Sequence, residues 1–581
     1  MSVLPGDNND KLKRSGINTQ AKRVFVQRWL ELIYFQTIDS HSVKLLNSNG
    51  VLLELTNVIE STLKNEIGSI HLTAVWEEAR EIIASDKILD KYELSLKSSL
   101  LKLLGKCPGA QKTDELEHVL HKLAPLKKIL ETGYFAWLLN SLDSALAKND
   151  SDMVYYLTGI LASELSYRRN PESLFLMGVR LKKDGFTDSA WNSFKCQIQP
   201  GSQVMGVFCP FSGQPKTLKQ FENKLSIALI PKNEVINRNP CIEDLLNDNP
   251  VLMSSYYLFV ATEAEDYQTA AFQAYDVFNE AIDVINLFQR DKIHIKNHLI
   301  VENHSVPNAI KQITGPSGPQ RIQSSLGGGN SLPIIIQYLN NTNADERIIT
   351  RLKSVIQYIR LSDTAHSQAT RFINLWVALE SLVRQQGNII DNIKQYVSAI
   401  LCNRYSYLLL RNFLEDSNRC RISLEPLIGN GTKSQLVYNL LTVIQNSPSQ
   451  LITACSEHDA LAIRAQELVS DLVTGTNAAR LIASHSKRLQ WNLVRLYRIR
   501  NSIIHAGETP NFIVPCTRHL NNYIFATLTN IIYRLSKHKI NSIAGVLGMH
   551  YSNHLLTIEE LRRQTHYDPK ILLDGPLFGR M

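Results

Sequence analysis

The sequence has 581 residues, which predicts two to four domains that each bury a core of their own. Hydrophobic residues make up 44% and charged residues 20%, a composition typical of soluble globular proteins. The net charge of +8 permits an anionic partner without requiring one.

The chain opens on a polar segment, MSVLPGDNNDKLKRSG, which lacks the apolar centre of a signal peptide. No apolar run elsewhere reaches the length needed to cross a bilayer. The eight cysteines are scattered and form no Cys-x-x-Cys pair, which argues against a zinc site and a disulfide framework. We therefore expect a cytoplasmic protein with reduced thiols, no membrane contact, no metal and no cofactor.

Helical periodicity dominates the first part of the chain. The segments QAKRVFVQRWLELIYFQ and ELEHVLHKLAPLKKILETGYFAWLLNSLDSAL repeat apolar residues every three or four positions. The segment SLFLMGVRLKKDGFTDSAWNSFKC predicts a helix, a Gly-Phe turn and a second helix, with no clean repeat beside it. We expect a helical N-terminal region over 1–199.

The pattern changes near residue 200. VMGVFC, KLSIALI and YYLFVA are short apolar runs bounded by Gly, Pro and Asn, which predicts strands. A helical stretch, QTAAFQAYDVFNEAIDVINLFQ, separates them from the alternating segment KIHIKNHLIVE. These patterns predict an α+β domain over 200–305.

The segment TGPSGPQRIQSSLGGGN is rich in Gly, Pro and Ser. Its glycines lack the Lys-Ser/Thr ending of a phosphate-binding loop, so it is better interpreted as a flexible linker, within 306–344. A helical bundle over 345–540 and a C-terminal appendage over 541–581 complete the predicted organisation. The expected fold class is mostly α, with a helical N-terminal region, a central α+β domain and a C-terminal helical bundle.

Within the bundle, RFINLWVALESLVR predicts a helix that faces a core. Its apolar stripe comprises Phe372, Leu375, Trp376, Leu379, Leu382 and Val383. Glu380 lies at the edge of this stripe. It is either a solvated carboxylate or the partner of a buried cation.

A later helix is strongly basic near its end. Five cations fall within fourteen residues, and they are Lys487, Arg488, Arg495, Arg498 and Arg500. Such a run is either a solvated face or a phosphate-binding surface, because Arg and Lys supply most non-specific affinity for nucleic acids.

The same helix ends in RNSIIHAG. Asn501 and His505 are four residues apart and share a face if the segment is α-helical. Arg500 is one step round from Asn501, and Gly507 with Pro510 predicts the helix end. The negative end of the helix dipole favours an imidazolium at His505, which can then give or take a proton near neutral pH.

An Arg and a His at this spacing are not distinctive by themselves. Arg480 and His485 have the same spacing in RLIASH, and RLSDTAH offers a similar pair, Arg360 and His366. RNSIIHAG differs from both in the Asn after its Arg, the apolar pair before its His and the helix stop that follows.

Taken together, RNSIIHAG and FINLWVALESLV resemble the motifs of the HEPN superfamily, and of its ApeA-like branch in particular. The first is similar to the catalytic motif of Arg, a polar residue and His. The second is similar to the Trp-x-Ala-Leu-Glu helix of that branch. The resemblance covers about 345 to 540.

The resemblance implies a helical bundle that forms a homodimer and acts as a metal-independent endoribonuclease of an antiphage, abortive-infection or toxin system. It implies that Arg500, Asn501 and His505 are catalytic, and that Glu380 orients the arginine. RNA, with tRNA as one candidate, is the expected partner, and Lys487, Arg488, Arg495 and Arg498 are the expected RNA-binding residues.

The expected reaction is attack of the RNA 2′-hydroxyl on the adjacent phosphate, which leaves a 2′,3′-cyclic phosphate. Residues 1 to 340 would sense a phage or regulatory trigger, or restrain the nuclease. The alternative is a non-catalytic RNA-binding or protein-interaction scaffold, in which His505 caps the end of an inert bundle.

Overall fold

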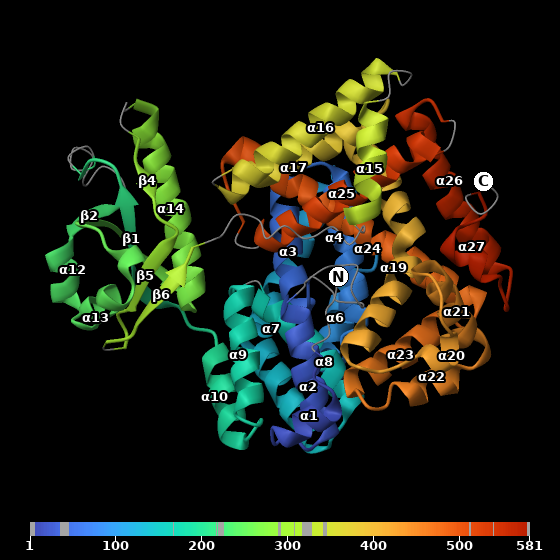
Figure 1. The fold of residues 1–581 in the computed structure, drawn as a ribbon, viewed down its shortest axis with the longest axis horizontal. Helices are drawn as coiled ribbons and strands as arrows, with labels where there is room; N and C mark the ends of the chain where they lie inside the picture. Colours follow the sequence, from blue (N-terminus) through green and yellow to red (C-terminus); the bar gives the residue numbers. More distant parts are fainter. Residues whose placement is uncertain are drawn as a thin grey trace.

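The computed structural model describes residues 6–34, 46–166, 168–215, 218, 226–288, 292–306, 308–315, 328–340, 345–365, 367–510, 513–537 and 540–577. Over these residues the fold is mostly helical, with an antiparallel sheet in the middle of the chain, which confirms the predicted fold class. Figure 1 shows the sheet and its helices (green) to one side of the N-terminal helices (blue to teal) and C-terminal helices (yellow to red).

The N-terminal region folds as the periodicity predicts. Its described helices are α1 (Asn9–Arg14), α2 (Gln20–Tyr34), α3 (Ser48–Leu63), α4 (Ser69–Ala84), α5 (Lys87–Tyr92), α6 (Leu94–Leu103), α7 (Thr113–Ala147), α8 (Ser151–Ser166), α9 (Pro171–Lys183) and α10 (Asp188–Ile198). Polar residues cap several of them. Asn47 starts α3 by accepting a hydrogen bond from Gly50 N at 2.8 Å.

Aromatic side chains build part of the N-terminal core. Phe25 and Trp29 of α2 stack at 5.9 Å between ring centroids, and Trp191 and Phe194 of α10 meet them edge-on. The Trp29 indole donates to the Leu174 carbonyl of α9 at 3.0 Å. Helices α9 and α10 therefore close over α2, which completes the helix-turn-helix unit that the sequence predicts.

The central domain is a three-layer arrangement around one sheet. Its elements are β1 (Gln203–Ser212), β2 (Ala228–Pro231), α12 (Lys232–Arg238), α13 (Cys241–Asp248), η1 (Pro250–Leu252), β3 (Tyr256–Ala264), α14 (Tyr267–Phe288), β4 (His294–Ile295), β5 (His298–Asn303) and β6 (Ile310–Thr314). The strand order is β2-β3-β1-β5-β6, every pairing is antiparallel, and β4 pairs with the end of β1 outside this order. Helix α14 covers one face, and α12 with α13 covers the other.

The central domain extends further than the sequence predicts. Strand β6 lies within the expected linker, 306–344, and pairs with β5 through Val301 and Lys311. The same stretch also contains helix α15 (Gly328–Leu339). The glycine-rich part between them, 316–327, lies outside the described residues.

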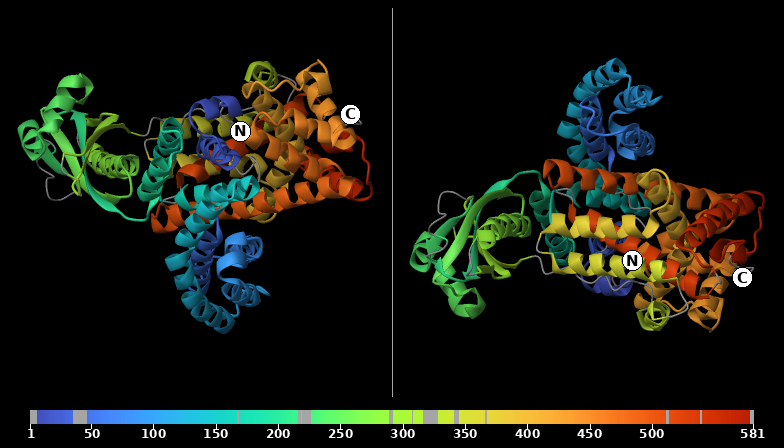
Figure 2. Two further views of the ribbon diagram at one scale, coloured as in Figure 1. Left: turned by 90° about the horizontal axis from the view of Figure 1, so that it is seen from below. Right: turned by 90° about the horizontal axis from the view of Figure 1, so that it is seen from above.

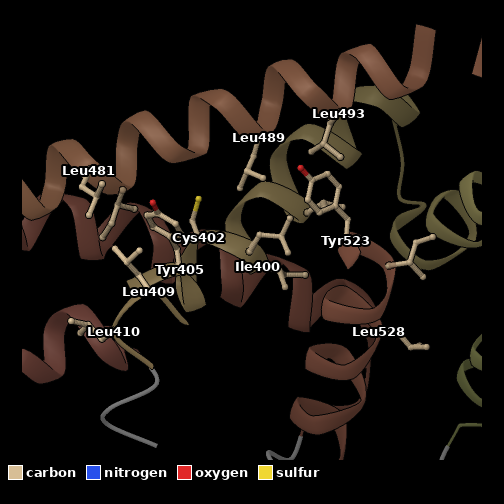
Figure 3. Close-up of a cluster of buried hydrophobic side chains, with 14 of the residues drawn as sticks. Ile400, Cys402, Tyr405, Leu409, Leu410, Leu481, Leu489, Leu493, Tyr523 and Leu528 are labelled. Carbon is tan, nitrogen blue, oxygen red and sulfur yellow. The ribbon is translucent and has the colours of Figure 1, made fainter. Parts of the chain in front are cut away.

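The rest of the chain is a large helical bundle. Its described elements are α15, α16 (Glu346–Thr364), α17 (Gln368–Val383), α18 (Ile389–Asn392), η2 (Ile393–Val397), α19 (Ser398–Arg419), α20 (Glu425–Ile428), α21 (Lys433–Asn446), α22 (Pro448–Ala454), α23 (Asp459–Leu472), α24 (Gly475–Asn501), η3 (Ser502–Ala506), α25 (Ile513–Lys537), α26 (Ile543–Arg562) and α27 (Pro569–Leu573). Figure 3 shows how α19, α24 and α25 share one core. Leu409 of α19, Leu489 of α24 and Tyr523 of α25 all point into it.

The C-terminal segment, 541–581, is part of this core where it is described, rather than an appendage to it. Val546, Leu547 and Leu561 of α26 are fully buried in the same cluster as the bundle. His550 of α26 accepts through its backbone carbonyl from Asn403 of α19 at 2.8 Å. Its weak amphipathic pattern hid this role in the sequence, because the buried face of α26 includes the polar residues His550, Asn553, His554 and Thr557, whereas Leu555 and Leu556 are exposed.

Buried ion pairs join the N-terminal region to the bundle. Arg464 of α23 is fully buried and pairs with Asp416 of α19 at 2.5 Å and with Glu31 of α2. Nearby, Arg23 Nε donates to Asp459 Oδ2 at 2.6 Å. Figure 2 shows α3 to α6 (blue) projecting from the flank of the bundle. The buried ion pairs therefore join the N-terminal helices to the bundle where α2 lies against α23.

None of the described helices is both long and apolar enough to span a membrane.

Candidate functional site

Helix α24 carries most of the predicted site. The Thr474 side chain caps it by accepting from Asn477 N at 3.3 Å. Its apolar side chains repeat every three or four residues and pack into the bundle core. This packing fixes the direction in which the helix presents its basic end.

The end of α24 is a π-turn rather than the α-helical turn that the sequence suggests. Residues Ser502–Ala506 have i→i+5 bonding, and Gly507 closes the turn with φ +69° and an N–H bond to the Ser502 carbonyl. Only glycine adopts this backbone conformation without strain, so the predicted stop at Gly507 is where the helix ends. Single π-turns of this kind occur often at functional sites.

The π-turn changes which side chains share a face. In an α-helix Asn501 and His505 would align, whereas wider i→i+5 bonding brings residues five apart, such as Arg500 and His505, nearer to one face. The Arg500 guanidinium is half-buried and donates to Asn501 Oδ1 at 3.1 Å, while its Nε has no described partner. His505 is exposed. The motif thus presents the exposed imidazole of His505 five residues after Arg500, whose guanidinium is hydrogen-bonded to Asn501.

The segment RLIASH, which has the same spacing between arginine and histidine, lies in a different environment. His485 is fully buried and stacks on Tyr405 at 3.6 Å between ring centroids. A histidine packed in this way is part of the core. Exposure therefore separates His505 from His485, although both follow an arginine at the same spacing.

Glu380 lies on α17 beside an aromatic stack. The Trp376 indole N–H donates to Glu380 Oε1 at 2.6 Å, one helical turn away. Trp376 stacks on Tyr497 of α24, and Tyr497 stacks on His71 of α4, each at 5.6 Å between centroids. Within the described residues Glu380 forms no ion pair, so the stack, rather than an arginine, holds this carboxylate.

The four expected RNA-binding cations have unequal environments. Lys487 is exposed, lies 3.8 Å from Glu77 and covers the Trp491 ring. Arg488 is half-buried and donates weakly to Ser484 Oγ at 3.4 Å. A ligand could therefore reach Lys487, whereas Nε and Nη2 of Arg488 are buried.

Arg495 and Arg498 differ from the sequence expectation of an open basic face. Arg495 is 2% exposed, and its Nε and Nη2 donate to the Glu54 carboxylate of α3 at 3.0 and 2.9 Å. Its Nη2 also donates to Glu78 of α4 at 2.5 Å, and Arg498 pairs with the same Glu54. Burial lowers the pKa of Arg498 to about 10. In this conformation both guanidiniums bind carboxylates, so RNA could reach them only if α3 and α4 moved.

A buried polar network supports Arg495 from the bundle side. Asn492 Oδ1 accepts from Arg495 Nη1 at 3.5 Å, and Asn492 Nδ2 donates to the Tyr523 hydroxyl at 3.0 Å. Tyr523 lies on α25, in the core shown in Figure 3. The basic helix is therefore held by carboxylates on one side and by neutral polar groups on the other.

Sequence reasoning missed Glu54, Glu78, His71 and Tyr497. The glutamates lie more than four hundred residues before Arg495 in the chain, and each sits in an ordinary amphipathic helix pattern. No local signal marks them. Only the tertiary structure, which places α3 and α4 beside α24, identifies them.

The described residues contain no group of three or more His, Cys, Asp or Glu side chains arranged to hold a metal ion. In comparisons with known proteins, the chain matches no protein-family model, no curated protein and no solved structure.

Proposed function

We propose that this chain is a metal-independent endoribonuclease, an effector of a prokaryotic antiphage or toxin system, whose reactive groups are Arg500, Asn501 and His505. The observation that carries the proposal is the end of α24, where an exposed histidine follows an arginine that its neighbour holds. The π-turn and Gly507 fix this arrangement at the surface. The resemblance of RNSIIHAG and FINLWVALESLV to HEPN motifs is the second support.

The chemistry needs no metal because RNA carries its own nucleophile. In the proposed reaction, an imidazole takes the proton of the 2′-hydroxyl, and the 2′-oxygen forms a bond to the adjacent phosphorus. The bond from phosphorus to the 5′-oxygen breaks, and an imidazolium supplies the proton to that leaving oxygen. The products are a 2′,3′-cyclic phosphate and a 5′-hydroxyl.

Arg500 has the geometry to stabilise the charged transition state. Its guanidinium can donate paired hydrogen bonds to two non-bridging phosphate oxygens. Its Nε is buried without a described partner, so the paired contact with a phosphate would have to come from the two Nη groups. Asn501, which accepts from Arg500 Nη1, orients the guanidinium.

One motif supplies one imidazole, whereas the reaction gains from a base and an acid. A homodimer would bring the partner's His505 to the same phosphate, and a two-fold axis makes the two sites equivalent. We therefore include a dimer in the proposal, with RNA as substrate and the N-terminal region as sensor or restraint.

The test compares the parent with His505→Ala on total RNA and on tRNA in the presence of EDTA. The expected result is cleavage by the parent that yields cyclic phosphate ends and is lost in His505→Ala, while RNA binding is retained. His566→Ala changes another exposed histidine and serves as the matched control. Equal cleavage by the parent and His505→Ala, or no cleavage by either, would contradict the proposal.

One observation favours the alternative of a non-catalytic scaffold. Arg495 and Arg498 already hold structural ion pairs, and of the other cations near the end of α24, Lys487 is exposed whereas Arg488 and Arg500 are half-buried. A scaffold of this kind would bind RNA or protein with a salt-sensitive affinity and release no cyclic phosphate.

A further inference from the structure

Helices α3 and α4 carry a group of carboxylates that lie against α24. Glu54 and Glu78 form its buried part and contact Arg495. Glu77 and Glu81 form its exposed part and lie 3.8 and 3.9 Å from Lys487. We call these four glutamates the acidic clamp. They face Lys487, Arg495 and Arg498, three of the four cations that the sequence predicts to bind RNA.

The inner half of the clamp has the geometry of phosphate recognition. Glu54 receives Nε and Nη2 of Arg495 through its two oxygens, a fork-to-fork contact at 3.0 and 2.9 Å. A phosphate offers the same pair of oxygens to the same donors. Carboxylate and phosphate therefore compete for one set of N–H groups.

The clamp is separate from the contacts that anchor the N-terminal region. That anchor joins α2 to α19 and α23 through Arg464, Glu31 and Asp416. The clamp joins α3 and α4 to α24. The clamp contacts could open while the α2 anchor stays closed, which would expose the basic face of α24 without unfolding the bundle.

The clamp also touches the candidate site. His71 of α4 stacks on Tyr497, which lies between Arg495 and Arg500 on α24 and stacks on Trp376 beside Glu380. Displacement of α4 would remove one face of this stack. Clamp opening would thus change both the charge of the RNA-binding face and the support of Glu380.

We propose that the acidic clamp is an intramolecular competitor of RNA, which holds α24 in a low-affinity state until α3 and α4 are displaced. This inference rests on the proposed RNA-binding role of α24, and it does not require that the protein cleaves RNA. Under this proposal, the restraint expected of the N-terminal region is the pairing of these glutamates with the cations of α24.

The test measures binding of a fluorescent single-stranded RNA by anisotropy, in a His505→Ala background so that cleavage does not interfere. Glu54→Gln frees donors of Arg495 and Arg498, and we expect affinity to rise by about tenfold with a steeper salt dependence. Glu559→Gln on α26 removes an exposed carboxylate paired with Arg563 and matches the charge change. Equal affinities for these two variants would overturn the proposal.

A second variant covers the case in which Glu54→Gln does not fold. Glu77→Gln/Glu81→Gln removes the exposed half of the clamp and leaves no buried charge unpaired. We expect an affinity gain of about threefold over Glu234→Gln/Glu559→Gln, which removes two exposed carboxylates elsewhere. If these two proteins bind RNA equally, or if neither binds RNA, the clamp proposal is wrong.

Amide exchange in a chain with an intact clamp supplies an independent measurement. With His505→Ala as the only change, saturating RNA should speed amide exchange in α3 and α4 and leave α2 protected. The proposed function is judged separately, by cyclic phosphate formation in the wild-type chain. A protein that shows clamp release without cleavage would reject the nuclease and keep the clamp.

Discussion

Arg464 and Asp416 form a fully buried ion pair, with Nη1 and Oδ2 2.5 Å apart and neither side chain exposed. Glu31, from a helix near the other end of the chain, pairs with the same guanidinium. The pair joins α19, α23 and α2. The free-energy cost of burying the Arg464 charge is offset by the carboxylates of Asp416 and Glu31 on either side of the guanidinium.

Asp416→Asn should destabilise the protein by about 3 to 5 kcal/mol, because it leaves part of a buried charge uncompensated. Urea denaturation followed by circular dichroism measures the change. Glu559→Gln, which breaks an exposed pair with Arg563, is the control and should cost less than about 1 kcal/mol. A similar loss in both variants would show that burial does not govern this pair.

Arg500→Lys should lower RNA cleavage by about 100-fold or more, although the charge is kept. Lysine is a point charge and cannot make the paired contacts of a guanidinium with phosphate, nor the same bond to Asn501. Single-turnover cleavage at saturating protein measures the rate. Binding of the same RNA should change little, and a rate close to that of the parent would remove Arg500 from the proposed site.

Trp376→Phe tests how Glu380 is held. Phenylalanine keeps a ring against Tyr497 but loses the N–H that donates to Glu380 at 2.6 Å. We expect a loss of unfolding free energy of about 1 to 3 kcal/mol, typical of a hydrogen bond to a charged group. If Glu380 is a positioning residue, the cleavage rate should fall while the KM for RNA stays constant.

Acid should destabilise the protein between about pH 6.5 and pH 4. Burial lowers the pKa of His71 and His554 to about 4, and burial with nearby arginines lowers that of His550 to about 3. The unfolded chain therefore binds protons first as the pH falls below about 6.5, so stability is full above that value and is lost below it. When the shift is complete, His71 and His554 each account for about 3 kcal/mol and His550 for about 5 kcal/mol.

His71→Phe isolates one of these groups. The phenyl ring keeps the stack on Tyr497 and removes the titrating nitrogens, one of which, Nδ1, is buried without a partner. The variant should match the parent near pH 7.5 and exceed its stability at pH 5. Thermal denaturation across this range measures the difference, and parallel pH profiles for the two proteins would contradict the assignment.

Removal of 541–581 should abolish soluble expression of the bundle. Val546, Leu547 and Leu561 are fully buried, and their loss would uncover apolar surface on α19 and α24. Removal of 578–581 alone should have no effect on expression, and it provides the control. A soluble, cooperatively folded product ending at residue 540 would show that this segment is an appendage after all.

The sequence by itself determined the helical fold class, the sheet strands near β1, β2, β3 and β5, and the helix stop at Gly507. These features depend on local patterns: apolar spacing, alternation, and a glycine that tolerates positive φ. The candidate motif was also visible, because Arg500, Asn501 and His505 lie within six residues.

Tertiary structure alone decided what the basic residues contact. Charge in a sequence does not say whether an arginine faces water or a carboxylate hundreds of residues away, and Glu54 meets Arg495 only because α3 and α4 pack on α24. The π-turn was likewise invisible, because α and π bonding use the same residues at that spacing. Contacts between distant parts of the chain, which apolar periodicity does not encode, determine which cations pair with carboxylates and which remain exposed.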